Sequence, residues 1–247
     1  MKVLLASSEI HPYSKTGGLA DMVGALGKTL ARQGHQVGMV TPLYSGVRER
    51  FPQIERLDCN LDFSLGATRA RGQVYFLKPA ANLTLYFVDQ PGFYQRAGLY
   101  QTDGVDFVDN AERFIFFSKT VANLAQHLPW KPEVLHLHDW QAAPAALLLH
   151  HHRRLGGQGN NPGLCMTIHN LAYQGIFPAA KFGLLNLPWD YYTPDGIEFY
   201  RQMSCLKAGL VYTDRLTTVS PRYAREISTE EFGCGLDGLL RQRQVGI

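Results

Sequence analysis

Cysteine is scarce in this sequence, and the few cysteines are too far apart to act together. None of the four belongs to a C-x-x-C motif; they are Cys59, Cys165, Cys205 and Cys234. This spacing argues against a disulfide framework and against a structural zinc site, and it fits a reducing compartment. We expect Cys165, which lies in an apolar segment, to be a small core residue of a strand.

Long apolar segments are also missing. The longest one, residues 142–149, contains Pro144 and is far shorter than the roughly 20 residues that cross a bilayer. The N-terminus lacks a charged region followed by a longer apolar stretch and a cleavage site, so no signal peptide is indicated. These absences lead us to expect a cytoplasmic protein without a membrane partner.

The chain has little excess charge of either sign. Its formal net charge is +3 over 247 residues, and the lysines and arginines are scattered. A nucleic-acid-binding face would need clustered basic residues, so we expect no nucleic-acid partner. With 45% hydrophobic and 18% charged residues, the composition is that of a globular protein with one large domain or two small ones.

Strands and helices alternate along the chain. Residues 3–6 form a short apolar run, a helical face follows over residues 19–30, Gly34 can end that helix, and residues 36–41 form a second strand. Further strands are expected at residues 74–77, 83–88, 134–138, 163–168 and 216–219. Helices are expected from Asp106 onward and at residues 141–152, 195–210 and 221–229, whereas residues 43–60 look irregular or loosely helical. The alternation predicts an α/β fold with a doubly wound, Rossmann-like sheet.

The loop after the first strand is the most informative segment. Lys15, Gly17 and Gly18 lie at the junction of that strand with the first helix, and Asp21 follows in the first turn. Paired glycines let a ligand approach the backbone, the helix start offers free N–H groups, and lysine adds a mobile positive charge. The pattern favours an anionic ligand such as a phosphate. A tight turn with a solvated lysine is the structural alternative.

Two other polar motifs should lie beside this loop. Residues 138–140 and residues 169–175 each follow a predicted buried strand. In doubly wound sheets, ligands bind at the carboxyl ends of the strands. We therefore expect the three motifs to converge on one site.

Seven motifs in order resemble those of bacterial glycogen synthases and plant starch synthases. The first, residues 8–21, reads SEIHPYSKTGGLAD. The others are DGVDFVDNAERF at 103–114, HLHDW at 136–140, TIHNLAYQG at 167–175, KAGL at 207–210, TTVSPRYARE at 217–226 and EFGCGLDGLL at 231–240. The motifs follow one another in order along essentially the whole chain, from residue 8 to residue 240, which is far more specific than any single motif.

The resemblance implies a retaining glucosyltransferase of the GT-B fold. Such an enzyme would transfer glucose from ADP-glucose to the non-reducing end of an α-1,4-glucan, such as glycogen or a malto-oligosaccharide, without Mg²⁺ or another cofactor. It would stabilise the departing ADP and an oxocarbenium-like transition state electrostatically. The family continues into a second domain that carries the nucleotide pocket, whereas this sequence ends at Val245-Gly246-Ile247. We therefore expect residues 1–247 to be the N-terminal, acceptor-side domain, inactive without the absent C-terminal nucleotide-binding domain.

The resemblance also assigns roles to individual residues. It implies that His169 and Asp139 are catalytic, with His169 against the transferred glucose, and that Lys15, Gly17, Gly18, Asp21, Tyr94 and Asn170 bind substrate. The structural alternatives are an N-cap for Asp139, a strand-end histidine for His169, a turn for Asn170 and a packed loop tyrosine for Tyr94.

The remaining polar residues suggest structural roles. His136 and His138 lie on one strand face, but no further ligand stands at structural-zinc spacing, so we expect no metal and at least one packed core histidine. Residues 150–152, three histidines, suit a solvated helix C-terminus. Asp106 and Asp109 suit a first helical turn, and Arg113 is expected to pair with one of them.

Two other functions compete with the synthase hypothesis. One is a glucan-binding module without catalysis, which would bind glucan independently of nucleotide. The other is a related GT-B enzyme that uses a different sugar nucleotide, because the residues that would read the base are not in this chain.

Overall fold

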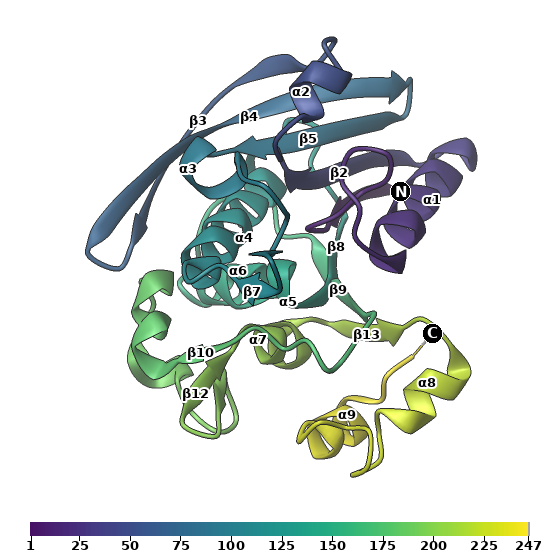
Figure 1. The fold of residues 1–247 in the computed structure, drawn as a ribbon. Coiled ribbons are helices and arrows are strands. Elements are labelled where there is room, and N and C mark those ends of the chain that lie inside the picture. Colours follow the sequence, from purple (N-terminus) through teal and green to yellow (C-terminus); the bar gives the residue numbers. More distant parts are fainter. Residues whose placement is uncertain (247) are drawn as a thin grey trace.

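An eight-stranded sheet runs through the computed structural model, which describes residues 1–246 (Figure 1). The strand order is β13-β9-β8-β1-β2-β5-β4-β3. The six parallel strands are β1 (Lys2–Ala6), β2 (Gln36–Pro42), β5 (Leu83–Asp89), β8 (Val134–His138), β9 (Gly163–Ile168) and β13 (Arg215–Thr218). Antiparallel strands β4 (Thr68–Ala80) and β3 (Glu55–Leu65) complete one edge.

Helices cover both faces of the parallel part of this sheet (Figure 1). Helices α1 (Gly18–Arg32) and α8 (Pro221–Glu226) lie on one side. On the other side lie α4 (Asn110–His127), α6 (Pro144–Arg154) and α7 (Cys205–Tyr212). This arrangement confirms the predicted doubly wound α/β fold. The parallel strands are buried because both faces are covered, which explains their short apolar sequences.

The order in which successive strands are added to the sheet reverses between the parallel neighbours β1 and β8. From β1 the order runs outward through β2 on one side and through β8, β9 and β13 on the other. Such a topological switch point opens a crevice at the carboxyl ends of the two central strands. The three motifs predicted to converge follow β1, β8 and β9, which are neighbours in the sheet.

Several boundaries match the prediction because they depend on local chemistry. Helix α1 begins directly after Gly17 and ends before Gly34, whose φ of 87° lies in the left-handed region. The strands expected at residues 74–77 and 83–88 lie within β4 and β5, which pair as an antiparallel hairpin. Helix α8 begins with Pro221 behind the N-cap Ser220, whose hydroxyl accepts from the N–H of Tyr223.

Two segments were assigned wrongly. Residues 55–60, expected to be irregular or loosely helical, belong to β3, an edge strand. Most of their side chains are exposed, so the sequence lacks the alternation of apolar and polar residues that indicates a half-buried strand. Residues 195–204, expected to be helical, contain β11 (Glu198–Phe199) and β12 (Gln202–Ser204). Strand β12 pairs with β11 on one side and with β10 (Ile176–Pro178) on the other, in a separate three-stranded sheet. The helix begins only at Cys205, where the Ser204 hydroxyl caps it.

Two helix starts also differ from the expectation. Helix α4 begins at Asn110, not Asp106, because β7 (Val105–Asp106) pairs with β6 (Gln101–Thr102). The helix expected over 141–152 begins earlier and is divided into α5 (Asp139–Ala142) and α6, with Pro144 at the first position of α6.

Short helical segments fill the connections. They are α2 (Val47–Arg50), α3 (Pro91–Tyr94) and α9 (Asp237–Arg243), together with the 3-10 segments Ala179–Leu185 and Trp189–Tyr191. None of the helices within residues 1–246 is both long and apolar enough to cross a membrane. All four cysteines are free thiols, and Cys165 lies in β9 as predicted but is half-buried, not a core residue. Ile247, the last residue of the sequence, lies outside the described residues.

Candidate active site

The loop after β1 is organised by a buried carboxylate that the sequence analysis did not select. Glu9 is 3% exposed. It accepts hydrogen bonds from the backbone N–H and hydroxyl of Thr16, from the N–H of Gly17 at 3.4 Å, and from the hydroxyl of Tyr100 at 2.7 Å. Glu9 therefore occupies backbone donors of the loop that an external anion would otherwise use.

Lys15 has a partner of its own. Its ammonium group donates to the carboxylate of Asp21 at 2.6 Å, and both side chains are about half exposed. This hydrogen bond, reinforced by the charge of Lys15, lowers the pKa of Asp21. An incoming phosphate would compete with Asp21 for the ammonium group. The two predicted binding residues therefore lie together.

The paired glycines leave open space in front of the loop. A Cβ atom built on Gly17 or on Gly18 meets nothing within 4 Å. Gly17 is the N-cap of α1 and supplies no side-chain acceptor for the first helical turn. Open space therefore lies in front of the helix start, although the N–H of Gly17 already donates to Glu9.

Asp139 is a buried carboxylate rather than a helix cap. It is the first residue of α5, has a φ of 57°, and is 8% exposed. The N-cap of α5 is His138, and no side chain caps that helix, so the N-cap alternative was wrong. Asp139 Oδ1 instead accepts from the backbone N–H of His169 at 2.8 Å. Burial raises the pKa of Asp139 to about 7.

His169 lies at the end of a row of three histidines. Its Nε2 is 3.1 Å from Nδ1 of His138, and the ring of His138 stacks on that of His136 with centroids 4.2 Å apart. Burial lowers the pKa of His136 and of His169 to about 4 each, and that of His138 well below its ordinary value. All three rings are therefore neutral at pH 7.

The loop after β9 is tied to the loop after β8. Asn170 is exposed, and its Oδ1 accepts from the N–H of Ala172 at 3.0 Å, which makes the turn that was one of its two interpretations. Gly175, with a φ of 60°, packs directly on the ring of Trp140. The convergence predicted for residues 138–140 and 169–175 is confirmed by these contacts.

Tyr94 does not reach the site surface. It is fully buried, its hydroxyl donates to the carbonyl of Arg113 at 2.8 Å, and its ring packs on that of Tyr44. A side chain with no exposed atom cannot bind a sugar or nucleotide in this conformation. Its assignment as a substrate-binding residue is therefore corrected to the packed alternative.

Arg113 also differs from its expected role. It is fully buried and donates to the carbonyls of Phe93 and Leu99 and to the side chain of Asn110. Asp109 pairs with Arg96 instead, at 2.5 Å. The expected pairing of Arg113 with Asp106 or Asp109 was wrong, because backbone carbonyls within reach satisfy the guanidinium group.

The histidines at the C-terminal end of α6 contact tyrosine side chains. His151 contacts the hydroxyl of Tyr191 at 3.0 Å, and His150 packs on Tyr212, so the three-histidine helix end is partly packed rather than simply solvated. Across residues 1–246, no cluster of three or more His, Cys, Asp or Glu side chains could hold a metal ion.

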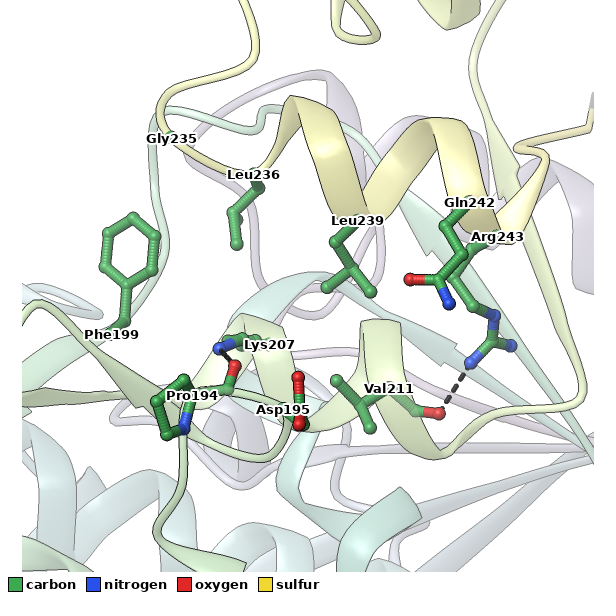
Figure 2. A pocket seen from close by; sticks show the side chains of 10 residues that line it. All are labelled: Pro194, Asp195, Phe199, Lys207, Val211, Gly235, Leu236, Leu239, Gln242 and Arg243. Atoms are coloured by element: carbon green, nitrogen blue, oxygen red, sulfur yellow. Dashed lines mark hydrogen bonds between the residues drawn. The ribbon is translucent and has the colours of Figure 1, made fainter.

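A separate pocket of about 530 Å³ lies between α7, α9 and residues 194–199 (Figure 2). None of the predicted site residues lines it. Figure 2 shows that its cations are already engaged, since Lys207 donates to the carbonyl of Pro194 and Arg243 to that of Val211. Lys207 also donates to the carbonyl of Glu198 at 2.7 Å.

Glu9 and His138 are the functional candidates that sequence reasoning missed or undervalued. Glu9 lies two residues after a strand that feeds a glycine-rich loop, and this position was the available signal. His138 was interpreted only as a possible metal ligand or core residue. Neither side-chain contact is local in the sequence: Glu9 meets Tyr100 and His138 meets His169.

Comparison with known proteins gives concordant matches. The family model described as starch synthase catalytic domain matches residues 2–242. The glycogen synthase of Opitutus terrae is 42% identical over 245 residues, which are 99% of this chain and 51% of the relative. That of Granulibacter bethesdensis is 43% identical over 249 residues, 98% of this chain and 50% of the relative. The chain thus spans about half the length of the curated relatives it matches.

A solved structure shares the fold of this chain over its full length. The catalytic domain of starch synthase IV from Arabidopsis thaliana, bound to ADP and acarbose, aligns with a TM-score of 0.85 at 28% sequence identity. The alignment covers 100% of this chain and 51% of that chain.

Proposed function

Because the chain belongs to the starch synthase catalytic domain family, we propose that it is the N-terminal, acceptor-side domain of a glycogen synthase and acts in the cytoplasm. The proposal covers residues 1–247 and assigns the nucleotide pocket to a C-terminal domain that this chain does not contain. Support comes from the coverage of the relatives, because nearly all of this chain aligns with about half of each one.

The proposed reaction is glucosyl transfer with retention. The bond between the anomeric carbon of ADP-glucose and its phosphate oxygen breaks, and ADP departs with the bonding electrons. A bond forms between that carbon and the 4-hydroxyl oxygen at the non-reducing end of an α-1,4-glucan, and the hydroxyl proton is released. Charge separates in the transition state, so electrostatic stabilisation is the main service that the protein can supply.

The site residues divide this work between the two sides of the crevice. Lys15 would attract the departing phosphate after exchanging its contact with Asp21, and the open space in front of Gly17 and Gly18 would admit that phosphate. His169 would contact the transferred glucose, together with the exposed turn at Asn170. Asp139 holds the backbone of His169 and, when ionised, would favour positive charge at the anomeric carbon.

The observation that carries the proposal is the meeting of the family motifs at adjacent strand ends. Asp139 from the end of β8 holds His169 from the end of β9, and the Lys15 loop follows β1 next to β8. Pockets between two domains need both walls, and closure completes the catalytic groups. We therefore propose that the chain alone transfers no glucose.

Calorimetric titration of the 247-residue chain with a malto-oligosaccharide, ADP and ADP-glucose in parallel tests the acceptor-side assignment. We expect glucan binding together with weak or absent nucleotide binding. Tight nucleotide binding without glucan binding would overturn the assignment and favour the phosphate interpretation of the Lys15 loop.

A chimera tests the catalytic part of the proposal. The chain is joined to the C-terminal half of the Opitutus terrae relative, and glucosyl transfer is measured from ADP-glucose and from a second sugar nucleotide. We expect transfer by the chimera, none by the chain alone, and loss of transfer in a matched His169→Ala chimera. Glucan binding without transfer in any correctly folded chimera would instead indicate a binding module.

A further inference from the structure

The contact between His138 and His169 has no role in the chemistry described above. His138 is fully buried at the end of β8, and its Nδ1 faces Nε2 of His169 at 3.1 Å. Their ring centroids are 5.3 Å apart. On its other side His138 stacks on His136, whose Nε2 is 2.6 Å from the hydroxyl of Thr167.

The two facing nitrogens must have opposite roles. Burial depresses the pKa values of both His138 and His169, so both imidazoles are neutral at pH 7. A neutral imidazole carries one N–H donor and one acceptor nitrogen. One ring therefore donates across the 3.1 Å contact, and the other accepts.

The second nitrogen of His138 indicates the direction of this hydrogen bond. Within residues 1–246, His138 Nε2 is buried and has no hydrogen-bond partner. A proton there would be a buried donor without an acceptor, and orphaned N–H groups are rarer in proteins than acceptors with unused capacity. The proton of His138 is thus better placed on Nδ1, directed at His169.

We propose that His138 is a positioning residue that fixes the tautomer of His169 by donating from its Nδ1 to Nε2 of that ring. The proton of His169 then resides on Nδ1. That atom makes no hydrogen bond within the described part of the chain and is not among its buried unpaired atoms. The ring therefore presents a single N–H donor outward, while Asp139 holds the backbone of the same residue.

The ligand of this donor follows from the proposed function, on which this last step rests. An outward imidazole N–H at the site would donate to a hydroxyl or ring oxygen of the glucosyl group. Because the tautomer is set before the ligand arrives, no proton has to be rearranged when the ligand binds.

The first test measures the tautomers directly in the 247-residue chain. Histidine is labelled with ¹⁵N, and a long-range ¹H–¹⁵N correlation spectrum at pH 7 distinguishes protonated from unprotonated ring nitrogens. The signals of His169 are assigned by their loss in His169→Asn. We expect Nδ1–H on both His138 and His169. A proton on Nε2 of His169, or a mixture of its tautomers, would overturn the proposal.

A matched pair of variants tests the cause. In His138→Asn, the amide nitrogen lies near the former Nδ1 and can still donate, whereas His138→Leu has a similar size and cannot. We expect His169 to keep its single tautomer in the Asn variant and to show a mixture in the Leu variant. A single unchanged tautomer in His138→Leu contradicts the proposal. If the Leu variant does not fold, the wild-type spectrum and the Asn variant still decide the direction of the bond.

Calorimetry with the malto-oligosaccharide and ADP-glucose tests the ligand step. For ADP-glucose, measured with the chimera described above, we expect about fivefold weaker binding in His138→Leu, the effect of about one net hydrogen bond, and near wild-type affinity in His138→Asn. Unchanged affinity despite a changed tautomer would overturn the ligand step alone. Binding of none of the proposed ligands by the wild type would count against the proposed function, while the spectra would still decide the His138–His169 bond.

Discussion

At the residue scale, the buried carboxylate of Asp139, a proposed site residue, lowers the stability of the fold at neutral pH. Its backbone is in the left-handed region, and its carboxylate is buried. Oδ1 accepts one hydrogen bond, from the backbone N–H of His169. Because its folded pKa of about 7 lies above the ordinary aspartate value of 3.8, the folded state binds more protons than the unfolded state between these values. The group therefore destabilises the fold increasingly as pH rises from about 4 to about 7, and maximally above that range.

Replacing Asp139 by Asn should expose this cost. The amide oxygen can still accept from His169, and Asn tolerates the left-handed position. We expect Asp139→Asn to raise the free energy of unfolding at pH 8 by up to about 4 kcal/mol, since one pKa unit corresponds to about 1.4 kcal/mol. Urea unfolding at several pH values measures this gain, which should shrink toward pH 4.

Asp21→Asn is the matched control with the opposite sign. Lys15 lowers the pKa of Asp21, so this carboxylate stabilises the fold above its unfolded pKa, and the contribution is lost as pH falls through the lower folded value. The Asn variant should therefore lose a little stability at neutral pH. An equal pH dependence in the two variants would show that the environment of Asp139 has been misjudged.

Glu9 is the second residue whose effect can be isolated. Glu9→Gln replaces one acceptor oxygen by an NH₂ group among several donors, including the N–H groups of Thr16 and Gly17. We expect a loss of about 1 to 3 kcal/mol in the free energy of unfolding, the cost of leaving a buried donor unpaired. Amide hydrogen exchange should become faster at Thr16 and Gly17 than in the wild type. Unchanged protection of both amides would contradict the role of Glu9 in ordering the loop.

At the scale of elements, substitutions at two glycines with different surroundings distinguish an effect on packing from an effect on ligand access. A Cβ on Gly175 would lie 2.3 Å from Trp140 Cε3, and the backbone there has a φ of 60°. Gly175→Ala should therefore lower the free energy of unfolding by about 2 to 4 kcal/mol through overpacking and left-handed strain. Chemical denaturation measures the loss.

Gly17→Ala is the matched control, because the added methyl group would meet nothing within 4 Å. Its unfolding free energy should stay within about 0.5 kcal/mol of the wild type, as for most surface substitutions, while ligand binding at the loop should weaken. A loss for Gly17→Ala as large as for Gly175→Ala would show that the space in front of the loop is not open.

The starts of helices α8 and α7 show which helix boundaries a local sequence pattern can predict and which it cannot. The start of α8 was predicted because Ser220 and Pro221 act through neighbouring residues. The start of α7 was not, because β12, which directly precedes it, pairs with β10, more than twenty residues away in sequence. A pairing partner outside the window cannot be read from a local pattern.

At the scale of the whole molecule, the thiols provide a probe of global opening. Cys234 is exposed, whereas Cys205 is buried under Trp140 and Gly175, and burial raises the pKa of its thiol. We expect Cys234 to react within seconds to minutes with an aromatic disulfide reagent and Cys205 to react at the rate of global unfolding. Cys234→Ser should remove the fast phase. Rapid modification of Cys205 in the native state would show that the core under Trp140 opens locally.

The sequence by itself determined the alternation of strands and helices, the parallel sheet and the family. These features depend on short apolar runs, on capping residues such as Gly17 and Ser220, and on motifs that are contiguous in the chain. It also placed Lys15, Asp139 and His169 at one edge, because parallel strands bring their carboxyl ends together.

Only the tertiary structure decided what each of these side chains does. Glu9 occupies the N–H groups of the Lys15 loop, Tyr94 lies fully inside the core, and His138 faces His169 across two strands. The contacts of Glu9 with Tyr100, of Tyr94 with Tyr44 and of His138 with His169 all join residues tens of positions apart. Burial and long-range hydrogen bonds belong to the packed molecule, so no local pattern of residues carries them.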